Sequence, residues 1–176
     1  GLLVTGKGGA GKSTIAACAV LGGQGFCSDD FVALERRAEG LFGHCLYSSL
    51  MLTTAQMTRF SQLADGAVRL RTDIFSKHMS PLASRFGDQI RQTLKIDAVA
   101  VPQIVADPVS ALVPGSRAAM LRAIAPTSVF SSPWREAERV RFLFDEVGAL
   151  TPLVYRSGSD FSRISQPLKD RYGLAV

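Results

Sequence analysis

A segment near the start of the chain combines residue types and spacing suited to binding phosphate. Its members, which we take as the candidate nucleotide-binding residues, are Gly6, Lys7, Gly8, Gly9, Ala10, Gly11, Lys12, Ser13 and Thr14. They fit the P-loop pattern G-x-x-x-x-G-K-[ST], which is informative between a strand and a helix. Glycines let backbone N–H groups converge on an anion, and a helix N-terminus adds unpaired donors. Lys12 is expected to reach the outer phosphates and Ser13 to hold Mg²⁺, so the pattern predicts a nucleoside triphosphate ligand.

Asp29 and Asp30 are the second chemical feature of the sequence. We expect residues 25–28 to form a strand, which places the pair at a strand end, where the ligand sites of α/β sheets collect. Neighbouring residues in an extended strand point to opposite faces, so both can address one nucleotide only if the chain kinks there. One carboxylate would accept the proton of an attacking hydroxyl, and the other would hold the metal or its waters. The competing interpretation is a solvated turn or a helix cap.

Length and composition favour a single α/β domain over residues 1–176. The 176 residues suffice for a sizeable core, and 47% of them are hydrophobic. No apolar run approaches the length of a membrane span, and nothing resembles a secretory signal, so we expect a cytoplasmic protein. The net charge of +5 comes mainly from scattered arginines, and nucleic acid is not an expected partner. Because the chain begins at Gly1 inside an expected interior strand, we expect an N-terminally truncated fragment.

The three cysteines, Cys18, Cys27 and Cys45, have no CxxC spacing, so neither a disulfide framework nor a zinc site is expected. Hydrophobic periodicity and turn residues predict the remaining elements. The expected strands are 2–5, 25–28, 68–71, 96–101 (closed by Pro102), 109–112 and 152–155. The expected helices are 12–21, 55–63 (capped by Thr53 or Thr54), 82–94, 117–124 (capped by Ser116), 134–147 and 161–172. In helix 134–147, Val140, Leu143, Phe144 and Val147 recur at core spacing. Together these elements predict a mixed sheet flanked by helices.

The segment around the phosphate loop resembles two protein families. Lys7 and the residues after it look like the signature-lysine loop of the partition and cell-division ATPases, whose lysine reaches across a dimer to the partner's nucleotide. Those proteins have a long helix after the loop, whereas the helix expected here stops at Gly22. The chain more closely resembles the HPr serine kinase/phosphorylase family and its uncharacterised relatives, whose nucleotide fold is shared with phosphoenolpyruvate carboxykinase. This second resemblance rests on residues 6–14, the short helix, the paired aspartates and segments 46–50 and 116–130.

The second resemblance implies a P-loop domain of the HPr kinase/phosphoenolpyruvate carboxykinase type and an ATP-dependent serine kinase. ATP and Mg²⁺ would be its cofactors, and its partner would be a protein or peptide carrying the acceptor serine. By the same resemblance Lys12 contacts the β- and γ-phosphates, Ser13 binds Mg²⁺, Asp29 is the base and Asp30 lies near the metal. Alternative functions are a switch or partition ATPase and a nucleotide-binding module without transfer activity. The oligomeric state is left open, with a homo-oligomer as one possibility.

One departure from the HPr enzymes concerns a metal contact. Those enzymes have a loop of the Glu-Ile-Arg-Gly type, whereas this chain has Thr53-Thr54-Ala55-Gln56 in that region. The glutamate is missing, which puts one metal contact and HPr as the substrate in doubt. Candidates for a compensating cation are Lys77, Arg117 and Arg122.

Overall fold

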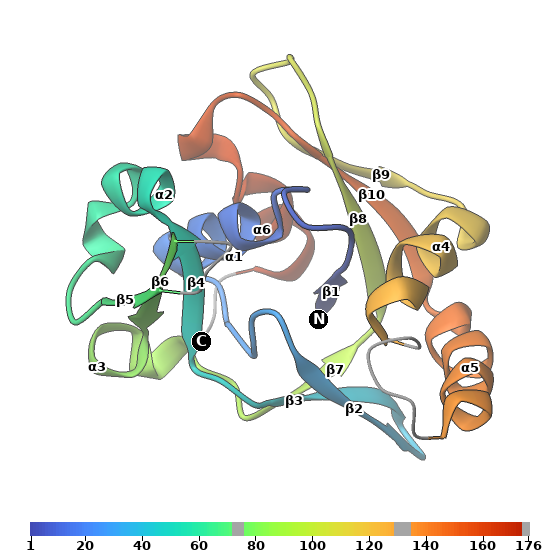
Figure 1. The fold of residues 1–176 in the computed structure, drawn as a ribbon. Helices are drawn as coiled ribbons and strands as arrows, with labels where there is room; N and C mark the ends of the chain where they lie inside the picture. The colour runs from blue at the N-terminus through green and yellow to red at the C-terminus, as the bar shows by residue number, and fades with distance from the viewer. Residues whose placement is uncertain (72–75, 129–134, 174–176) are drawn as a thin grey trace.

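The computed structural model describes residues 1–71, 76–128 and 135–173 of the chain (Figure 1). This part has a mixed α/β fold in which small sheets are flanked by helices, so the expected fold class of a mixed sheet with helices is confirmed at that level. Within these residues, no helix is long and apolar enough to cross a membrane.

The largest sheet has four strands and carries the start of the chain at its edge. In order across the sheet, the strands are β1 (Leu2–Val4), β8 (Ala98–Ile104), β10 (Thr151–Ser157) and β9 (Ala111–Pro114). β1 and β10 both pair with β8 in parallel, and β9 pairs with β10 antiparallel. The register places Leu3 opposite Val99, so β1 has β8 as its neighbour on one side.

Two antiparallel sheets of three strands each complete the β-structure of the described residues. One contains β2 (Val32–Arg37), β3 (Gly40–Cys45) and β7 (Thr93–Ile96), and the other contains β4 (Ser49–Thr53), β6 (Ser76–Pro81) and β5 (Val68–Arg71). β3 and β6 are the central strands of their sheets. β4 is therefore an edge strand, and it lies against α1.

Helices cover both faces of the four-stranded sheet (Figure 1). The α-helices are α1 (Lys12–Leu21), α2 (Thr54–Arg59), α3 (Ala83–Phe86), α4 (Arg117–Ser128), α5 (Glu136–Asp145) and α6 (Gln166–Tyr172). Short 3₁₀ helices span Ser61–Leu63, Gly87–Gln89, Val147–Ala149 and Phe161–Arg163. Successive side chains of a strand point to opposite faces. Accordingly Ala98 and Ala100 of β8 lie in the core cluster that contains α1, and Val99 lies in the cluster formed with α4 and α5.

Some of the expected elements are confirmed, and others differ in the structure. The helix 12–21 and the strand 68–71 are confirmed with the predicted bounds, and Thr53 caps α2 as expected. The strand expected at 25–28 is wrong, because Phe26 forms only an isolated bridge with Ile90. The helix expected at 82–94 is also wrong: it stops after α3 and a 3₁₀ turn, and β7 follows. Pairing of β7 with β3 outweighs the helical periodicity of that segment.

The strand expected at 96–101 is divided between β7 and β8 at Asp97, and β8 runs past Pro102. Thr5 donates its backbone N–H to the carbonyl of Ala100 at 3.0 Å. The backbone hydrogen-bonding groups of Ala100, and of every second residue of β8 from there, therefore point toward β1. Pro102 faces the same side, where β1 has already ended at Val4. The missing N–H of this proline therefore falls at the point where the pairing between β1 and β8 ends.

Two expected helices have different limits in the structure. α4 continues through Pro126 to Ser128, although Pro126 was expected to begin a turn. α5 begins at Glu136, and Trp134 lies outside the described residues. Leu143 and Val147 are buried as expected, but Phe144 is 49% exposed, so its predicted core position is wrong. The helix expected at 161–172 is a 3₁₀ turn followed by α6.

Candidate functional site

The glycine-rich segment 6–14 joins the edge strand β1 to the N-terminus of α1. Gly6, Gly9 and Gly11 have φ angles of 151°, 79° and 98°, which residues with a Cβ rarely adopt. The side chain of Lys12 folds back over the loop and donates to the carbonyl of Gly6 at 2.8 Å and to that of Lys7 at 3.1 Å. The Lys7 side chain is exposed. The loop thus presents a lysine and a helix N-terminus at one place.

The structure brings Asp29 to this place. Its carboxylate is 8% exposed, and its Oδ2 atom lies 3.4 Å from the Ser13 hydroxyl, which donates to it. The same oxygen accepts the backbone N–H of Met51 in β4 at 2.9 Å. A carboxylate that is this buried needs such partners, because an unpaired charge away from water is costly. Asp29 therefore links β4 to the first turn of α1.

Asp30 has a different environment from its neighbour. Its φ of 57° kinks the chain, and the N–H of Phe31 reaches back to the carbonyl of Asp29 at 2.6 Å. The two side chains consequently diverge: Asp29 is buried beside Ser13, while Asp30 is exposed. The kink that the sequence required is present, although the preceding segment is not the regular strand that was expected. Of the two carboxylates, the structure places Asp29 next to the predicted metal residue Ser13.

Burial is the largest influence on the acidity of Asp29 and raises the pKa of its carboxyl group. The N–H of Met51 acts in the opposite direction, the charge of Asp30 raises the pKa further, and the charge of Lys77 lowers it. Of the three candidate cations, Lys77 is thus the one whose charge acts on the carboxyl group of Asp29. Arg117 instead donates to the carbonyl of Phe144 in α5 at 2.9 Å, and Arg122 is an exposed residue of α4.

Gln56 is a residue of this region whose contact the sequence did not reveal. Its side-chain amide donates to the Thr14 hydroxyl at 2.8 Å. Gln56 also forms a capping box with Thr53 at the start of α2. The spacing Thr53-x-x-Gln56 signals the cap, but nothing local signals a contact with a residue 42 positions away. Within the residues that the structure describes, no group of three or more His, Cys, Asp and Glu could hold a metal.

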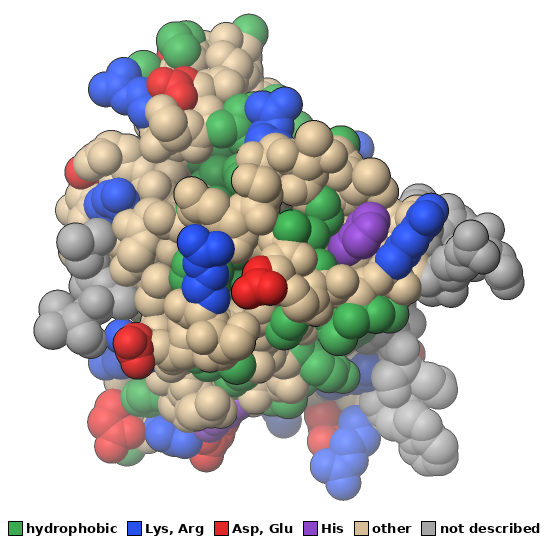
Figure 2. Space-filling model, turned by 90° about the vertical axis from the view of Figure 1, so that its left-hand side faces the viewer, with side chains coloured by type: hydrophobic (Ala, Val, Ile, Leu, Met, Phe, Trp, Pro, Cys, Tyr) green, Lys and Arg blue, Asp and Glu red, His purple; other side chains and the backbone are tan. Residues whose placement is uncertain are grey.

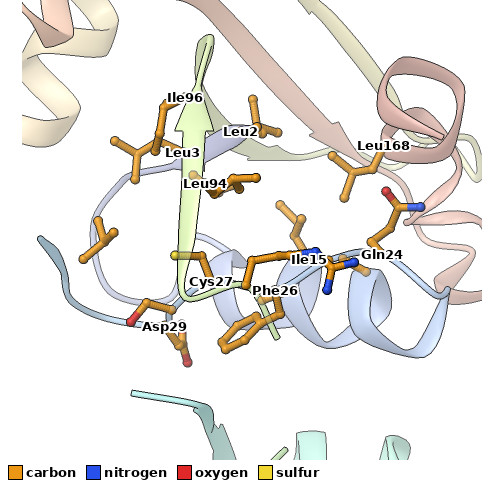
Figure 3. Close-up of a pocket in the computed structure, with 18 of the residues that line it drawn as sticks. Leu2, Leu3, Ile15, Gln24, Phe26, Cys27, Asp29, Leu94, Ile96 and Leu168 are labelled. Atoms are coloured by element: carbon orange, nitrogen blue, oxygen red, sulfur yellow. The ribbon is translucent and has the colours of Figure 1, made fainter. Parts of the chain in front are cut away.

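A mainly apolar pocket of about 390 Å³ adjoins the loop (Figure 3). Residues from several elements line it, including Leu2 and Leu3 of β1, Ile15 of α1, Leu94 and Ile96 of β7, and Leu168 of α6. Figure 3 shows Asp29 and Leu168 toward opposite ends of this pocket. Lys12 and Asp30 also line it, so the candidate site and the pocket share a boundary.

Charged side chains do not gather into one basic surface on the face shown in Figure 2. That view shows Lys, Arg, Asp and Glu side chains scattered singly or in small groups among polar and apolar surface. A uniformly basic surface, the electrostatic footprint of nucleic-acid binding, is not seen there.

Comparisons with known proteins show a distant structural similarity. No family model matches the chain, and no curated protein matches it. The structure of the Hpr(Ser) kinase/phosphatase from Coxiella burnetii is similar to 64% of this chain at 17% identity, with a TM-score of 0.40. The chain covers 63% of that structure's own length. The expected relationship to the HPr kinase family is thus found only as a distant structural similarity, and membership stays a prediction.

Proposed function

We propose that this chain binds ATP with Mg²⁺ and transfers the γ-phosphate to the hydroxyl of a serine in a protein or peptide. The supporting observation is the convergence of Lys12, Ser13 and the buried carboxylate of Asp29 at the N-terminus of α1. We also propose that residues 1–176 form one P-loop domain of the HPr kinase/phosphoenolpyruvate carboxykinase type.

In this proposal, the backbone of residues 6–14 surrounds the phosphates of ATP. The positive φ angles of Gly9 and Gly11 turn the chain sharply, and a Cβ added at Gly9 would meet nothing within 4 Å, so the loop is open on that side. N–H groups of the loop and of the first turn of α1 would bind the phosphate oxygens. Lys12 would exchange the carbonyls of Gly6 and Lys7 for the β- and γ-phosphates, which are stronger partners because they are charged.

Ser13 and a carboxylate would hold Mg²⁺, which prefers oxygen ligands and is often completed by phosphates and water. When bound, this ion neutralises charge that develops on the transferred phosphoryl group. The family resemblance assigns the carboxylate role to Asp30. The 3.4 Å separation between Ser13 and Asp29 makes Asp29 the alternative carboxylate. Variants of the two aspartates distinguish these assignments.

Asp29 would accept the proton of the serine hydroxyl as that oxygen attacks the γ-phosphorus. A new bond forms between the serine oxygen and phosphorus, the bond from phosphorus to the β–γ bridging oxygen breaks, and ADP leaves. Burial raises the pKa of Asp29, which makes its carboxylate a stronger proton acceptor than an exposed one. Lys77, whose charge acts on Asp29, would help to keep that carboxylate ionised before the transfer.

The experiment that tests this proposal follows the label from ATP radiolabelled at the γ-phosphate, in the presence and absence of a pool of serine-containing peptides. We expect the parent to label peptide and Lys12→Ala to lose nucleotide binding. Asp29→Asn should still bind ATP but transfer phosphate roughly a hundredfold to ten-thousandfold more slowly, the usual contribution of a general base. Asp30→Asn is the matched control: the family assignment predicts that it needs more Mg²⁺ but keeps its transfer rate at saturation.

Two other results would replace the proposal. If phosphate is released only to water, and Asp29→Asn leaves that release unchanged, Asp29 is not the base and a switch ATPase is the better interpretation. Dimerisation that requires both ATP and Lys7 would support that ATPase. Tight binding of ATP with no turnover at all would instead indicate a nucleotide-binding module.

A further inference from the structure

Two side-chain bridges tie the edge strand β4 to the first turn of α1. In one bridge, Asp29 accepts the N–H of Met51 and the hydroxyl proton of Ser13. In the other, Gln56 accepts the N–H of Thr53 at 2.8 Å and donates to the Thr14 hydroxyl at 2.8 Å. The bridges therefore join alternate residues of β4 to consecutive residues of α1. The second bridge plays no part in the mechanism described above.

The contacts of Gln56 fix which way its amide points. Its Oε1 atom accepts the Thr53 N–H at 2.8 Å and lies 3.0 Å from the Thr53 hydroxyl. A backbone N–H can only donate, so the carbonyl side of the amide must face Thr53. The NH₂ side then faces Thr14, and this group has donors but no acceptor.

This orientation determines how the Thr14 hydroxyl can be used. A hydroxyl has one O–H donor and two acceptor lone pairs, and Gln56 occupies one of those lone pairs. The Thr14 hydrogen cannot point at the amide NH₂. Among the hydrogen bonds of the described residues, none is donated by this hydroxyl, so its hydrogen is available to an acceptor beside the loop. A phosphate oxygen is such an acceptor.

We propose that Gln56 is a positioning residue of the nucleotide site, which holds the Thr14 hydroxyl as a hydrogen-bond donor toward a phosphate group. This inference rests on the proposed binding of ATP, although it does not depend on phosphate transfer. It assigns a role in binding to the corner between β4 and α2, which lies outside the glycine-rich loop.

The test is the affinity for ATP with Mg²⁺ of the variant Gln56→Glu, measured by isothermal titration calorimetry. Glutamate also serves as the last residue of a capping box, so the helix cap at Thr53 is kept. A carboxylate only accepts hydrogen bonds, so the Thr14 hydrogen would turn toward it and away from the phosphate. We expect roughly ten- to a hundredfold weaker binding, the range for one hydrogen bond to a charged group, and an unchanged melting temperature.

Making the same substitution in a Thr14→Val variant separates the effect of the Thr14 hydroxyl on binding from the effect of the added negative charge. In Thr14→Val there is no hydroxyl to redirect, so Gln56→Glu should weaken binding much less than it does in the parent. An equal factor in both backgrounds would show simple charge repulsion and would overturn the inference. Thr58→Ala is the matched control on α2: the Thr58 hydroxyl donates to the carbonyl of Thr54 within that helix at 3.2 Å, so its loss should leave nucleotide binding unchanged.

The failure of this inference can be told apart from the failure of the proposed function. If the parent binds ATP and Gln56→Glu binds it equally well, Gln56 does not position the site, and the proposed function is untouched. If the parent binds no ATP, the proposed function fails and this inference fails with it.

Discussion

At the residue scale, the buried carboxylate of Asp29 is the feature that most needs explaining. Aspartate is seldom buried unless it is paired, yet this side chain is 8% exposed, and its hydrogen-bond partners are a hydroxyl and a backbone N–H. Burial raises its pKa, so ionising it in the folded protein costs stability. Perturbed carboxylates of this kind collect at functional sites. The stability lost at Asp29 is consistent with a catalytic role.

The pH dependence of unfolding tests this view of Asp29. Its folded pKa lies above the unfolded value, so between the two values the folded state binds more protons and stability falls as the pH rises. The contribution of Asp29 is therefore most favourable below its ordinary pKa and is lost as the pH rises through the folded pKa. We expect Asp29→Asn to melt at a higher temperature than the parent near neutral pH, with the difference disappearing in acid. Thermal unfolding across pH measures it.

The exposed neighbour provides the control for that experiment. Asp30→Asn changes the same residue type one position away and should shift the melting temperature little at any pH, because exposed substitutions have small effects. A lower melting temperature for Asp29→Asn at neutral pH would show that the Asp29 charge stabilises the fold, contrary to this expectation.

The sequence predicted some members of the site and missed others for a physical reason. The glycine-rich loop and the two aspartates are short continuous patterns whose residue types already state their chemistry. Met51 and Gln56 reach the site only because β4 lies beside α1, and the Met51 contribution is a backbone N–H that any residue could supply. Lys77 was one of three candidate cations, and the choice between them depended on the position of β6.

At the element scale, α5 shows how closely a helix face must be defined. Its apolar residues have helical spacing, but adjacent residues of a helix differ by about 100° in direction. Leu143 is 4% exposed and packs with Met120 and Val147, whereas Phe144 is 49% exposed. The apolar stripe of this helix is thus narrower than the sequence pattern suggested, and hydrophobicity alone did not define its limit.

A pair of alanine substitutions on α5 measures this difference. Leu143→Ala should lower the free energy of unfolding by about 2–5 kcal/mol, because it leaves a cavity in the core. Phe144→Ala should change it by about 0.5 kcal/mol or less, as substitutions on the surface usually do. Urea denaturation of the two variants provides the comparison. Equal losses would mean that both side chains are buried in solution.

Strand pairing explains the elements that were predicted wrongly. The periodicity of residues 82–94 is helical, but the last part of this segment forms β7 and bonds to β3, which lies far away in the sequence. Residues 25–28 are apolar enough for a strand but have only one bridge, between Phe26 and Ile90. Local patterns record propensity, and they contain no information about which distant edge is available.

At the scale of the whole molecule, the four-stranded sheet holds the two core clusters together. Its parallel strands β1, β8 and β10 have helices on both faces, as parallel strands require. Tyr155 of β10 is fully buried and donates its hydroxyl to the carbonyl of Ile164, just before α6. This bond joins the middle of the sheet to the C-terminal helix. Burial also raises the pKa of Tyr155, so its hydroxyl keeps the proton that it donates.

Removing the Tyr155 hydroxyl should affect the entire fold. Tyr155→Phe leaves the carbonyl of Ile164 buried without this donor, which should cost about 1–3 kcal/mol of unfolding free energy. Tyr47→Phe is the control, because that tyrosine is 57% exposed and should tolerate the change. Equilibrium denaturation in urea measures both. No loss in Tyr155→Phe would mean that another donor replaces the hydroxyl.

The fold class followed from the sequence, but the division into three sheets did not. A strand, a glycine-rich loop and a helix in succession already indicate an α/β protein. The order β1-β8-β10-β9 depends on contacts between segments at both ends of the chain. The limits of β8 were likewise misjudged, because the strand neighbours that tolerate Pro102 are visible only in three dimensions.

Pro102 sets the point at which the chain leaves the sheet. In a pair of parallel strands, a residue whose N–H donates to one residue of the neighbouring strand uses its C=O to accept the N–H of the residue two positions further along that neighbouring strand. Thr5 donates to Ala100, so its own carbonyl would next accept an N–H from position 102, and proline has none. The ladder between β1 and β8 therefore terminates at Thr5, and Gly6, with its φ of 151°, begins the loop at the next residue. Pro102 thus limits the length of β1, although it is almost a hundred residues away along the chain.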